Sequence, residues 1–141
     1  MGDTGKGTTA AWGDYDGDSF LDLYVANWSC FPKCDPVDFT QAQDRLYHNN
    51  GDGAFADVSN LLTYNKLLGS AFSASFVDYD NDGDADLYVV NDKVQNPIGN
   101  VLWRNDGADK DGSAAAGAGP TFRRRWGGRH RPRHGAGAGR L

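Results

Sequence analysis

The sequence predicts an all-β protein that is built from two copies of one unit. The stretch over residues 12–27 recurs without a gap over residues 76–91. In each copy an Asp-rich segment is followed by alternating apolar residues, and a period of two is typical of a β-strand. All nineteen acidic residues are Asp and none is Glu. Because Asp favours turns and loops over helix interiors, this composition argues against a helical fold.

The strands of each unit are expected from the alternation and from the turn residues between them. In the first unit they are expected over residues 8–12, 21–27, 45–49 and 55–58. In the second unit they are expected over residues 70–77, 85–91 and 101–105, and no fourth strand is expected there. The Asp-rich segments then become hairpin loops, and Asn-Gly and Asp-Gly at residues 50–53 predict a further hairpin turn. Residues 60–68 join the units as a helical turn or a loop.

Aromatic residues recur in matching register in the two units. We expect all of them to pack in the core between stacked sheets. The pairs are Trp12 with Phe76, Tyr24 with Tyr88, and Tyr47 with Trp103.

Each Asp-rich loop has the carboxylate spacing of a cation site. Asp stands at loop positions 1, 3, 5 and 9, so one tight turn can bring four carboxylates to a point. Without a cation they would repel one another strongly, and a hard, all-oxygen ligand set suits calcium. A plain Asp/Gly turn is the alternative, which two copies in the same register disfavour. The carboxylates are Asp14, Asp16, Asp18 and Asp22 in the first loop and Asp78, Asp80, Asp82 and Asp86 in the second.

The same spacing occurs in the first nine positions of an EF-hand loop. That loop needs a bidentate Glu at position 12 and helices on both sides. Position 12 is Val25 or Val89 here, within a strand pattern. The sequence therefore argues against an EF-hand.

Cys30 and Cys34 are the only cysteines, and they lie in an insertion over residues 28–44 that the second unit lacks. A disulfide that closes a short loop is the preferred interpretation, and two free thiols are the alternative. A zinc site is not expected, because two cysteines supply half a ligand set and no second pair exists.

Charge and hydropathy limit the function classes. Residues 1–119 carry seven Lys and Arg against nineteen Asp, which argues against nucleic acid as a partner. No apolar run reaches the ~18–20 residues of a membrane span, and the N-terminal residues lack the apolar segment of a signal peptide.

No nucleophile–base pair, His cluster or paired Glu is apparent, so an enzyme is not expected. His48 stands alone beside a turn, and we expect it to be a surface or structural residue.

These motifs resemble the FG-GAP, or VCBS-type, repeat family over roughly residues 7–107. The resemblance is carried by W-G-D-Y-D-G-D-x-x-L-D-L-Y-V-A-N, R-L-Y-x-N-N-G-D-G-x-F-x-D-V and F-V-D-Y-D-N-D-G-D-x-D-L-Y-V-V-N. The Y-V-A-N and N-N-G-D-G-x-F forms are most similar to the cartilage acidic protein and ASPIC/UnbV-associated branch. A repeat of about 60 residues with four short strands is the signature of a propeller blade. We therefore expect antiparallel four-stranded blades, about two of them, from an incomplete β-propeller.

The resemblance implies a non-catalytic, calcium-binding propeller of a secreted or surface protein. It adds the carbonyl oxygen of Phe20 to the first ligand set and that of Asp84 to the second. Gly83 matches the glycine that the family usually has at loop position 6, whereas the first loop has Ser19. A non-Gly residue at positive φ costs about 1 kcal/mol, so we expect the first site to bind more weakly.

Three hypotheses of function follow. The first is an interaction or adhesion module with structural calcium, located outside the cell, in the periplasm or on the cell surface. Its partners would be an unidentified protein or glycan ligand and the remaining blades of a longer protein. The second is an accessory propeller domain of a secreted enzyme, such as a carbohydrate-active one. The third is a truncated product with no function of its own.

The chain divides into a first blade over residues 1–68, a second, incomplete blade over residues 69–107 and a tail over residues 108–141. The tail is rich in Gly, Ala and then Arg, lacks apolar periodicity and is expected to be disordered. Its abrupt change of composition also suggests a reading-frame artefact, because GC-rich coding DNA read out of frame yields such tracts. A genuine basic tail that binds polyanions is the alternative.

Overall fold

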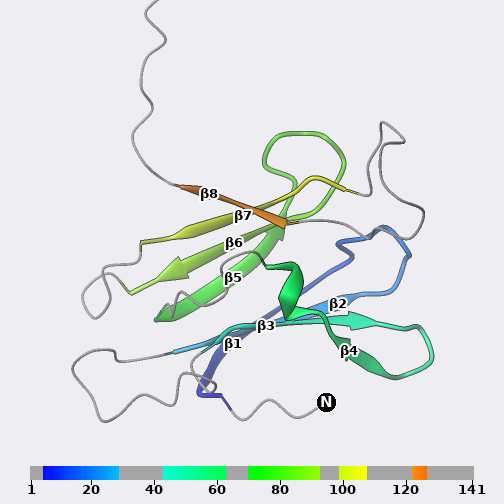
Figure 1. Ribbon diagram of the computed structural model, residues 1–141, viewed down its shortest axis with the longest axis horizontal. Helices are drawn as coiled ribbons and strands as arrows, with labels where there is room; N and C mark the ends of the chain where they lie inside the picture. The colour runs from blue at the N-terminus through cyan, green and yellow to red at the C-terminus, as the bar shows by residue number, and fades with distance from the viewer. Residues whose placement is uncertain (1–4, 29–42, 63–69, 93–98, 108–121, 127–141) are drawn as a thin grey trace, which may run out of the picture.

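The protein consists of two four-stranded antiparallel sheets (Figure 1). The computed structural model describes residues 5–28, 43–62, 70–92, 99–107 and 122–126. Within these residues the only helical element is a single 3-10 turn, so the all-β prediction is confirmed. None of the described helical residues could span a membrane. The two sheets do not close into a ring.

The strands follow the chain in order within each sheet. The first sheet contains β1 (Gly7–Gly13), β2 (Asp22–Asn27), β3 (Arg45–Asn49) and β4 (Phe55–Asp57). The second sheet contains β5 (Ala71–Val77), β6 (Asp86–Asn91), β7 (Val101–Asn105) and β8 (Phe122–Trp126). The 3-10 turn η1 (Ser59–Leu61) follows β4, where a helical turn or loop was expected. Each of the first seven strands begins and ends within one residue of the bounds that the sequence predicts.

β8 contradicts the prediction that the second sheet lacks a fourth strand. Residues 122–126 pair antiparallel with β7, so the expected disorder of the tail is wrong for this segment. The Arg-rich sequence gives no strand pattern, because the strand depends on backbone pairing with β7 and on burial of Phe122, the fully buried side chain among those of residues 122–124 that the structure describes. Phe122 also forms a parallel bridge with Leu62, far away in the sequence. The remainder of the predicted tail lies outside the described residues.

The two sheets repeat in register as well as in order. Gly13 pairs with Asp22 where β1 meets β2, and Val77 pairs with Asp86 where β5 meets β6. Both inner hairpins therefore present the Asp at loop position 9 at the same place.

The outer hairpins repeat in the same way. Asn49 pairs with Phe55 across β3 and β4, and Asn105 pairs with Phe122 across β7 and β8. Phe122 thus occupies in the second sheet the place that Phe55 has in the first. The predicted turn at residues 50–53 is confirmed as the β3–β4 connection, with Gly51 at φ 76°.

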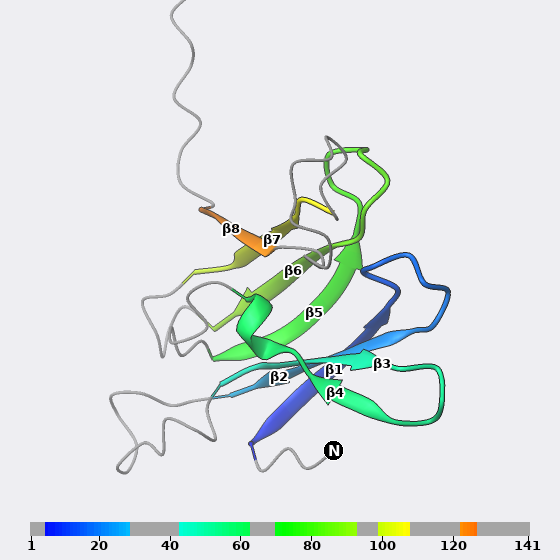
Figure 2. The same cartoon turned by 45° about the vertical axis from the view of Figure 1, so that its right-hand side comes forward.

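The sheets pack against each other across one hydrophobic core, and β5 runs beside β1 and β2 (Figure 2). Thr8 Oγ1 joins them: it lies 2.5 Å from the carbonyl oxygen of Ala71 and 3.2 Å from that of Ala26, and its one hydroxyl hydrogen can be donated to either. Gly13 permits the close approach, because a Cβ there would lie 2.5 Å from the ring of Phe76. Among the described residues, the largest fully buried core side chains are those of Tyr24, Phe122, Leu46, Leu87 and Val89.

The aromatic prediction is correct only in part. Tyr24, Tyr47 and Trp103 are buried, but Trp12 is 56% exposed and Tyr88 is 38% exposed. Side chains alternate across a strand, so Trp12 lies on the face opposite the buried Ala11. Trp12 packs edge-on against the ring of Phe55, with 6.1 Å between centroids.

Candidate metal centre

The loop between β1 and β2 is wound around the carboxylate of Asp14. Asp14 Oδ1 accepts hydrogen bonds from the backbone N–H of Gly17 (2.7 Å) and Asp18 (3.1 Å), and Oδ2 accepts one from Ser19 (2.9 Å). These bonds hold the chain in a tight turn. Asp14, Asp16 and Asp18 each offer a carboxylate oxygen within 4.8 Å of the others.

Asp22, at loop position 9, ties this loop to β3. Its side chain is fully buried. Oδ2 accepts a hydrogen bond from the backbone N–H of Tyr15 (3.1 Å), and Oδ1 accepts one from that of Asn49 (2.9 Å). The carboxylate is therefore fixed from both sides, and it lies close to Asp16.

The second loop repeats this arrangement. Asp78 accepts hydrogen bonds from the backbone N–H of Asp82 (3.2 Å) and Gly83 (3.0 Å). The fully buried Asp86 accepts them from Tyr79 (3.0 Å) and Asn105 (2.7 Å). Oxygens of Asp78, Asp80 and Asp86 lie within 4.8 Å of one another.

Both loops need positive φ at positions 4 and 6, but they place their glycines differently. The first loop has Gly17 (φ 78°) and then Ser19 (φ 74°), whereas the second has Asn81 (φ 61°) and then Gly83 (φ 93°). Asn tolerates this conformation better than Ser does. The expected positive φ at Ser19 is confirmed, and the second loop also carries one non-Gly residue at positive φ. That the first site binds more weakly stays a prediction.

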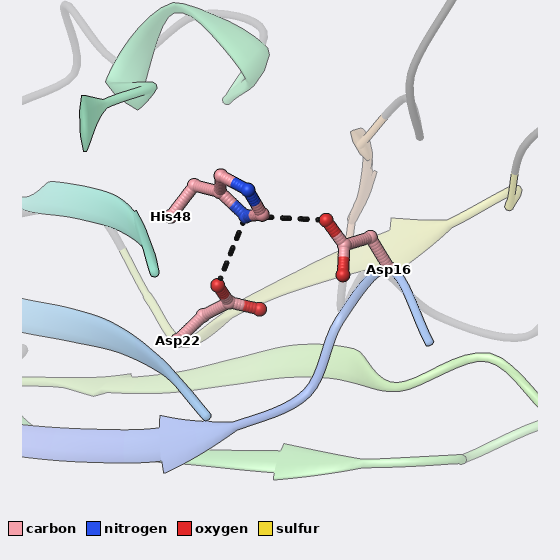
Figure 3. Close-up of side chains that lie close together, drawn as sticks. All are labelled: Asp16, Asp22 and His48. Carbon is pink, nitrogen blue, oxygen red and sulfur yellow. Dashed lines mark hydrogen bonds and ion pairs between the residues drawn. The ribbon is translucent and has the colours of Figure 1, made fainter. Parts of the chain in front are cut away.

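His48 on β3 completes the first carboxylate cluster, which Figure 3 shows in detail. Its Nδ1 lies 3.2 Å from Asp16 Oδ2 and 3.2 Å from Asp22 Oδ1. Asp16, Asp22 and His48 form a group whose potential ligand atoms all lie within 4.8 Å of one another. The sequence predicts only a surface or structural role for His48. Its position directly before Asn49, in the strand that pairs with β2, is the signal that could have identified it.

Arg104 holds the matching place beside the second loop. Its Nε lies 3.0 Å from Asp80 Oδ2 and 3.2 Å from Asp106 Oδ1, and its Nη2 lies 3.4 Å from Asp82 Oδ2. Asp82 thus forms an ion pair with the guanidinium of Arg104. It is not part of the group that Asp78, Asp80 and Asp86 form. The sequence analysis did not single out Arg104, although R-N-D-G at residues 104–107 aligns with H-N-N-G at residues 48–51.

Burial and mutual repulsion disfavour the charged carboxylates. Burial raises the pKa of Asp16, and the neighbouring Asp22 and Asp18 raise it further. Burial likewise raises the pKa of Asp22 and of Asp86, against the opposing effect of their backbone hydrogen bonds. A bound cation would relieve this unfavourable charge.

The donor chemistry of both loops fits a hard divalent cation such as calcium. Three carboxylates converge in each loop: Asp14, Asp16 and Asp18 in the first, and Asp78, Asp80 and Asp86 in the second. Asp22 lies close to Asp16 and His48 but is not grouped with Asp14 and Asp18, so the predicted convergence of all four carboxylates is only partly confirmed. The N–H of Phe20 is bonded to Asp18 Oδ1 (2.8 Å) and that of Asp84 to Asp82 Oδ1 (3.1 Å), so both residues are held at the loops. That their carbonyl oxygens bind metal stays a prediction. The proposed Cys30–Cys34 disulfide lies outside the described residues.

Comparison with known families finds an FG-GAP-like repeat over residues 37–89. The matched segment includes β3, β4, β5 and the whole second Asp loop. No curated protein and no solved structure was found to match the chain.

Proposed function

We propose, on the premise of this FG-GAP-like repeat, that the chain is a calcium-binding segment of a β-propeller and serves as a non-catalytic interaction module. The repeat itself suggests a propeller-type module. The finer assignment that we propose is the VCBS-type or ASPIC/UnbV-associated branch. The module would belong to a secreted or surface protein and bind a protein or glycan ligand.

The observation that carries this proposal is the repeated connection from each loop to the third strand of its sheet. The N–H of Asn49 is bonded to Asp22 and that of Asn105 to Asp86, so the buried carboxylate at loop position 9 joins loop and strand. A cation bound at these carboxylates would therefore lock a hairpin to its neighbouring strand. This favours a structural role for the metal.

The exposure of Tyr88 in the second sheet supports a longer propeller. Tyr24 and Tyr88 are equivalent, because each lies directly after a buried Leu in the second strand of its sheet. Tyr24 is fully buried in the core that the two sheets share, whereas Tyr88 remains exposed. A further blade, stacked as the second is on the first, would cover Tyr88.

Calcium titration by calorimetry, paired with thermal melts in calcium and in chelator, tests the proposal. Ligand that binds only the folded state adds about 2.7 kcal/mol at a hundredfold excess over Kd, so calcium should raise the melting temperature. Asp14→Ala and Asp78→Ala should each remove one of the loops from the calcium titration. Asp52→Ala, in the β3–β4 turn, is the matched control and should leave the titration unchanged. Identical melts in calcium and chelator, with no heat of binding, would refute the structural role of calcium.

A further inference from the structure

The two loops differ in the side chain that the third strand presents to the carboxylates. β3 presents His48 to the first loop, and β7 presents Arg104 to the second. The two positions match, because each directly precedes the Asn whose N–H is bonded to the Asp at loop position 9. The difference is therefore a substitution at one site of the repeat.

The two side chains have opposite consequences for metal binding. A guanidinium has only hydrogen-bond donors and no lone pair to offer, so Arg104 serves its loop as a fixed cation. A neutral imidazole nitrogen is among the commonest metal ligands in proteins. His48 can therefore add a nitrogen ligand where Arg104 cannot.

We propose that the first loop binds a divalent transition-metal ion of the zinc and cobalt class through Asp16, Asp22 and His48. The inference deepens the proposed function, because it gives one of the two cation loops a different metal. Calcium takes oxygen ligands almost exclusively, whereas imidazole combined with carboxylate suits zinc and its neighbours.

The geometry of the three side chains supports this ligand set. Nδ1 of His48 lies 3.2 Å from an oxygen of Asp16 and 3.2 Å from an oxygen of Asp22. Two ligands at the usual zinc distances in a tetrahedral site are separated by about 3.3 Å. The two distances from Nδ1 match this spacing, and the oxygens of Asp16 and Asp22 lie within 4.8 Å of each other on the same side of the imidazole (Figure 3).

The surroundings also hold the ligands in place. The N–H groups of Tyr15 and Asn49 bond the two oxygens of Asp22 and fix its orientation. The ring of Tyr15 packs edge-on against the imidazole, with 6.2 Å between centroids. Such outer contacts orient metal ligands and strengthen binding. Three protein ligands leave a fourth position for water. Asp18 lies on the other side of the ring, with its carboxylate 4.0 Å from His48 Nε2, the nitrogen that does not face Asp16 and Asp22.

Zinc titration of the full chain, in excess calcium, tests the proposal. We expect one zinc ion to bind without displacement by calcium, and the ring nitrogens of His48 to shift in two-bond ¹⁵N–¹H spectra. His48→Gln should weaken zinc binding at least about tenfold while calcium binding at the second loop persists. The double substitution of His130 and His134 by Gln is the control, because these are the other histidines, and it should leave zinc binding intact.

Exchange of the two side chains gives a second test that does not depend on loss of a contact. His48→Arg copies the second loop and should abolish zinc binding in a folded protein. Arg104→His should create a second zinc site. Zinc affinity that is unchanged in both His48 variants, or zinc that calcium displaces, would overturn the proposal. Zinc binding through His48 without any calcium binding would instead refute the calcium proposal alone.

Discussion

The side-chain amide of Asn105 donates a hydrogen bond to the backbone carbonyl oxygen of Tyr15 over 2.6 Å, between residues 90 positions apart. Asn105 is fully buried, and its own N–H is bonded to Asp86. One residue of the second sheet therefore contacts the first Asp loop through its side chain and the second loop through its backbone. The two candidate cation sites are mechanically connected.

We predict that Asn105→Ala destabilises the protein by about 1–3 kcal/mol, because it leaves the buried carbonyl of Tyr15 without this donor. Asn49→Ala is the matched control. Asn49 has the same place in the first sheet, but its side chain donates to Leu21 in an exposed position. It should cost about 0.5–1 kcal/mol. Urea unfolding of both variants measures the difference, and equal losses would show that the contact between the sheets contributes little.

Ser19→Gly should stabilise the protein by about 1 kcal/mol, since glycine adopts positive φ without steric strain. The backbone N–H of residue 19 still reaches Asp14, so the loop keeps its shape. The gain should appear as a higher melting temperature and as tighter cation binding by the first loop alone. Gly83→Ser, the reverse change in the second loop, should destabilise by a similar amount. A Ser19→Gly variant that melts at the wild-type temperature would contradict the strain argument.

Tyr24→Ala should destabilise the chain by about 3–5 kcal/mol, because it empties a core site. It also removes the 2.6 Å hydrogen bond from the Tyr24 hydroxyl to Asp44. Tyr88→Ala should cost less than about 1 kcal/mol in this chain, since Tyr88 is at the surface. Attached to a following blade, the same Tyr88→Ala change should approach the cost of Tyr24→Ala. Equal effects of Tyr88→Ala in short and extended chains would argue against stacking on this face.

The stability of the metal-free protein should fall as pH rises from about 4 to neutrality. Burial raises the pKa of Asp16, Asp22 and Asp86, so the folded state binds more protons than the unfolded state in that range. The stabilisation that these carboxyl groups contribute is fully present below their pKa in the unfolded state, near 4. It is lost as pH rises through their higher pKa values in the folded state. Urea unfolding in chelator at about pH 5 and about pH 7 measures the slope. Calcium should abolish or reverse this dependence of stability on pH. Asp16→Asn should make the dependence weaker.

The cation loops could be predicted from the sequence because their geometry is local. Asp14 bonds residues three to five positions ahead, so the D-x-D-x-D spacing alone indicates how the turn is wound. His48 lies 26 residues from Asp22, and only the pairing of β2 with β3 brings the two together. Because such pairing depends on the register of strands that lie apart in the sequence, no partner for His48 or Arg104 could be predicted from local patterns.

The fourth strand of the second sheet was missed for a similar reason. Arg123, the residue after Phe122, is largely exposed and paired with Asp106, so β8 has little apolar pattern of its own. Its position depends on β7 and on the bridge to Leu62, both distant in the sequence. The pattern of residues within a short segment does not reveal contacts with strands that lie far away in the sequence.

The register of β8 gives a sharper prediction about the reading frame of the tail. Phe122 matches Phe55, and Arg124 matches Asp57, because Tyr47 pairs with Asp57 as Trp103 pairs with Arg124. Phe122 thus still matches the repeat, after a Gly- and Ala-rich segment that the first unit lacks, and the sequence departs from the repeat at the next residue. Burial lowers the pKa of Arg124, because desolvation disfavours the charged guanidinium. We therefore expect the frame to change directly after Phe122 and not at residue 107.

The coding DNA tests this expectation. Residues 122–126 can be written TTC CGC CGA CGT TGG, and a shift of one base after the first codon gives GCC GAC GTT, or Ala-Asp-Val. The result, Phe-Ala-Asp-Val, is the sequence of residues 55–58. The same shift allows residues 129–134 to open a third D-x-D-x-D loop. If the DNA of the tail lacks these codons, or carries a stop codon in the shifted frame, the Arg-rich tail is genuine. If it holds them, a chain restored to that frame should show a longer fourth strand and a higher melting temperature than the present one.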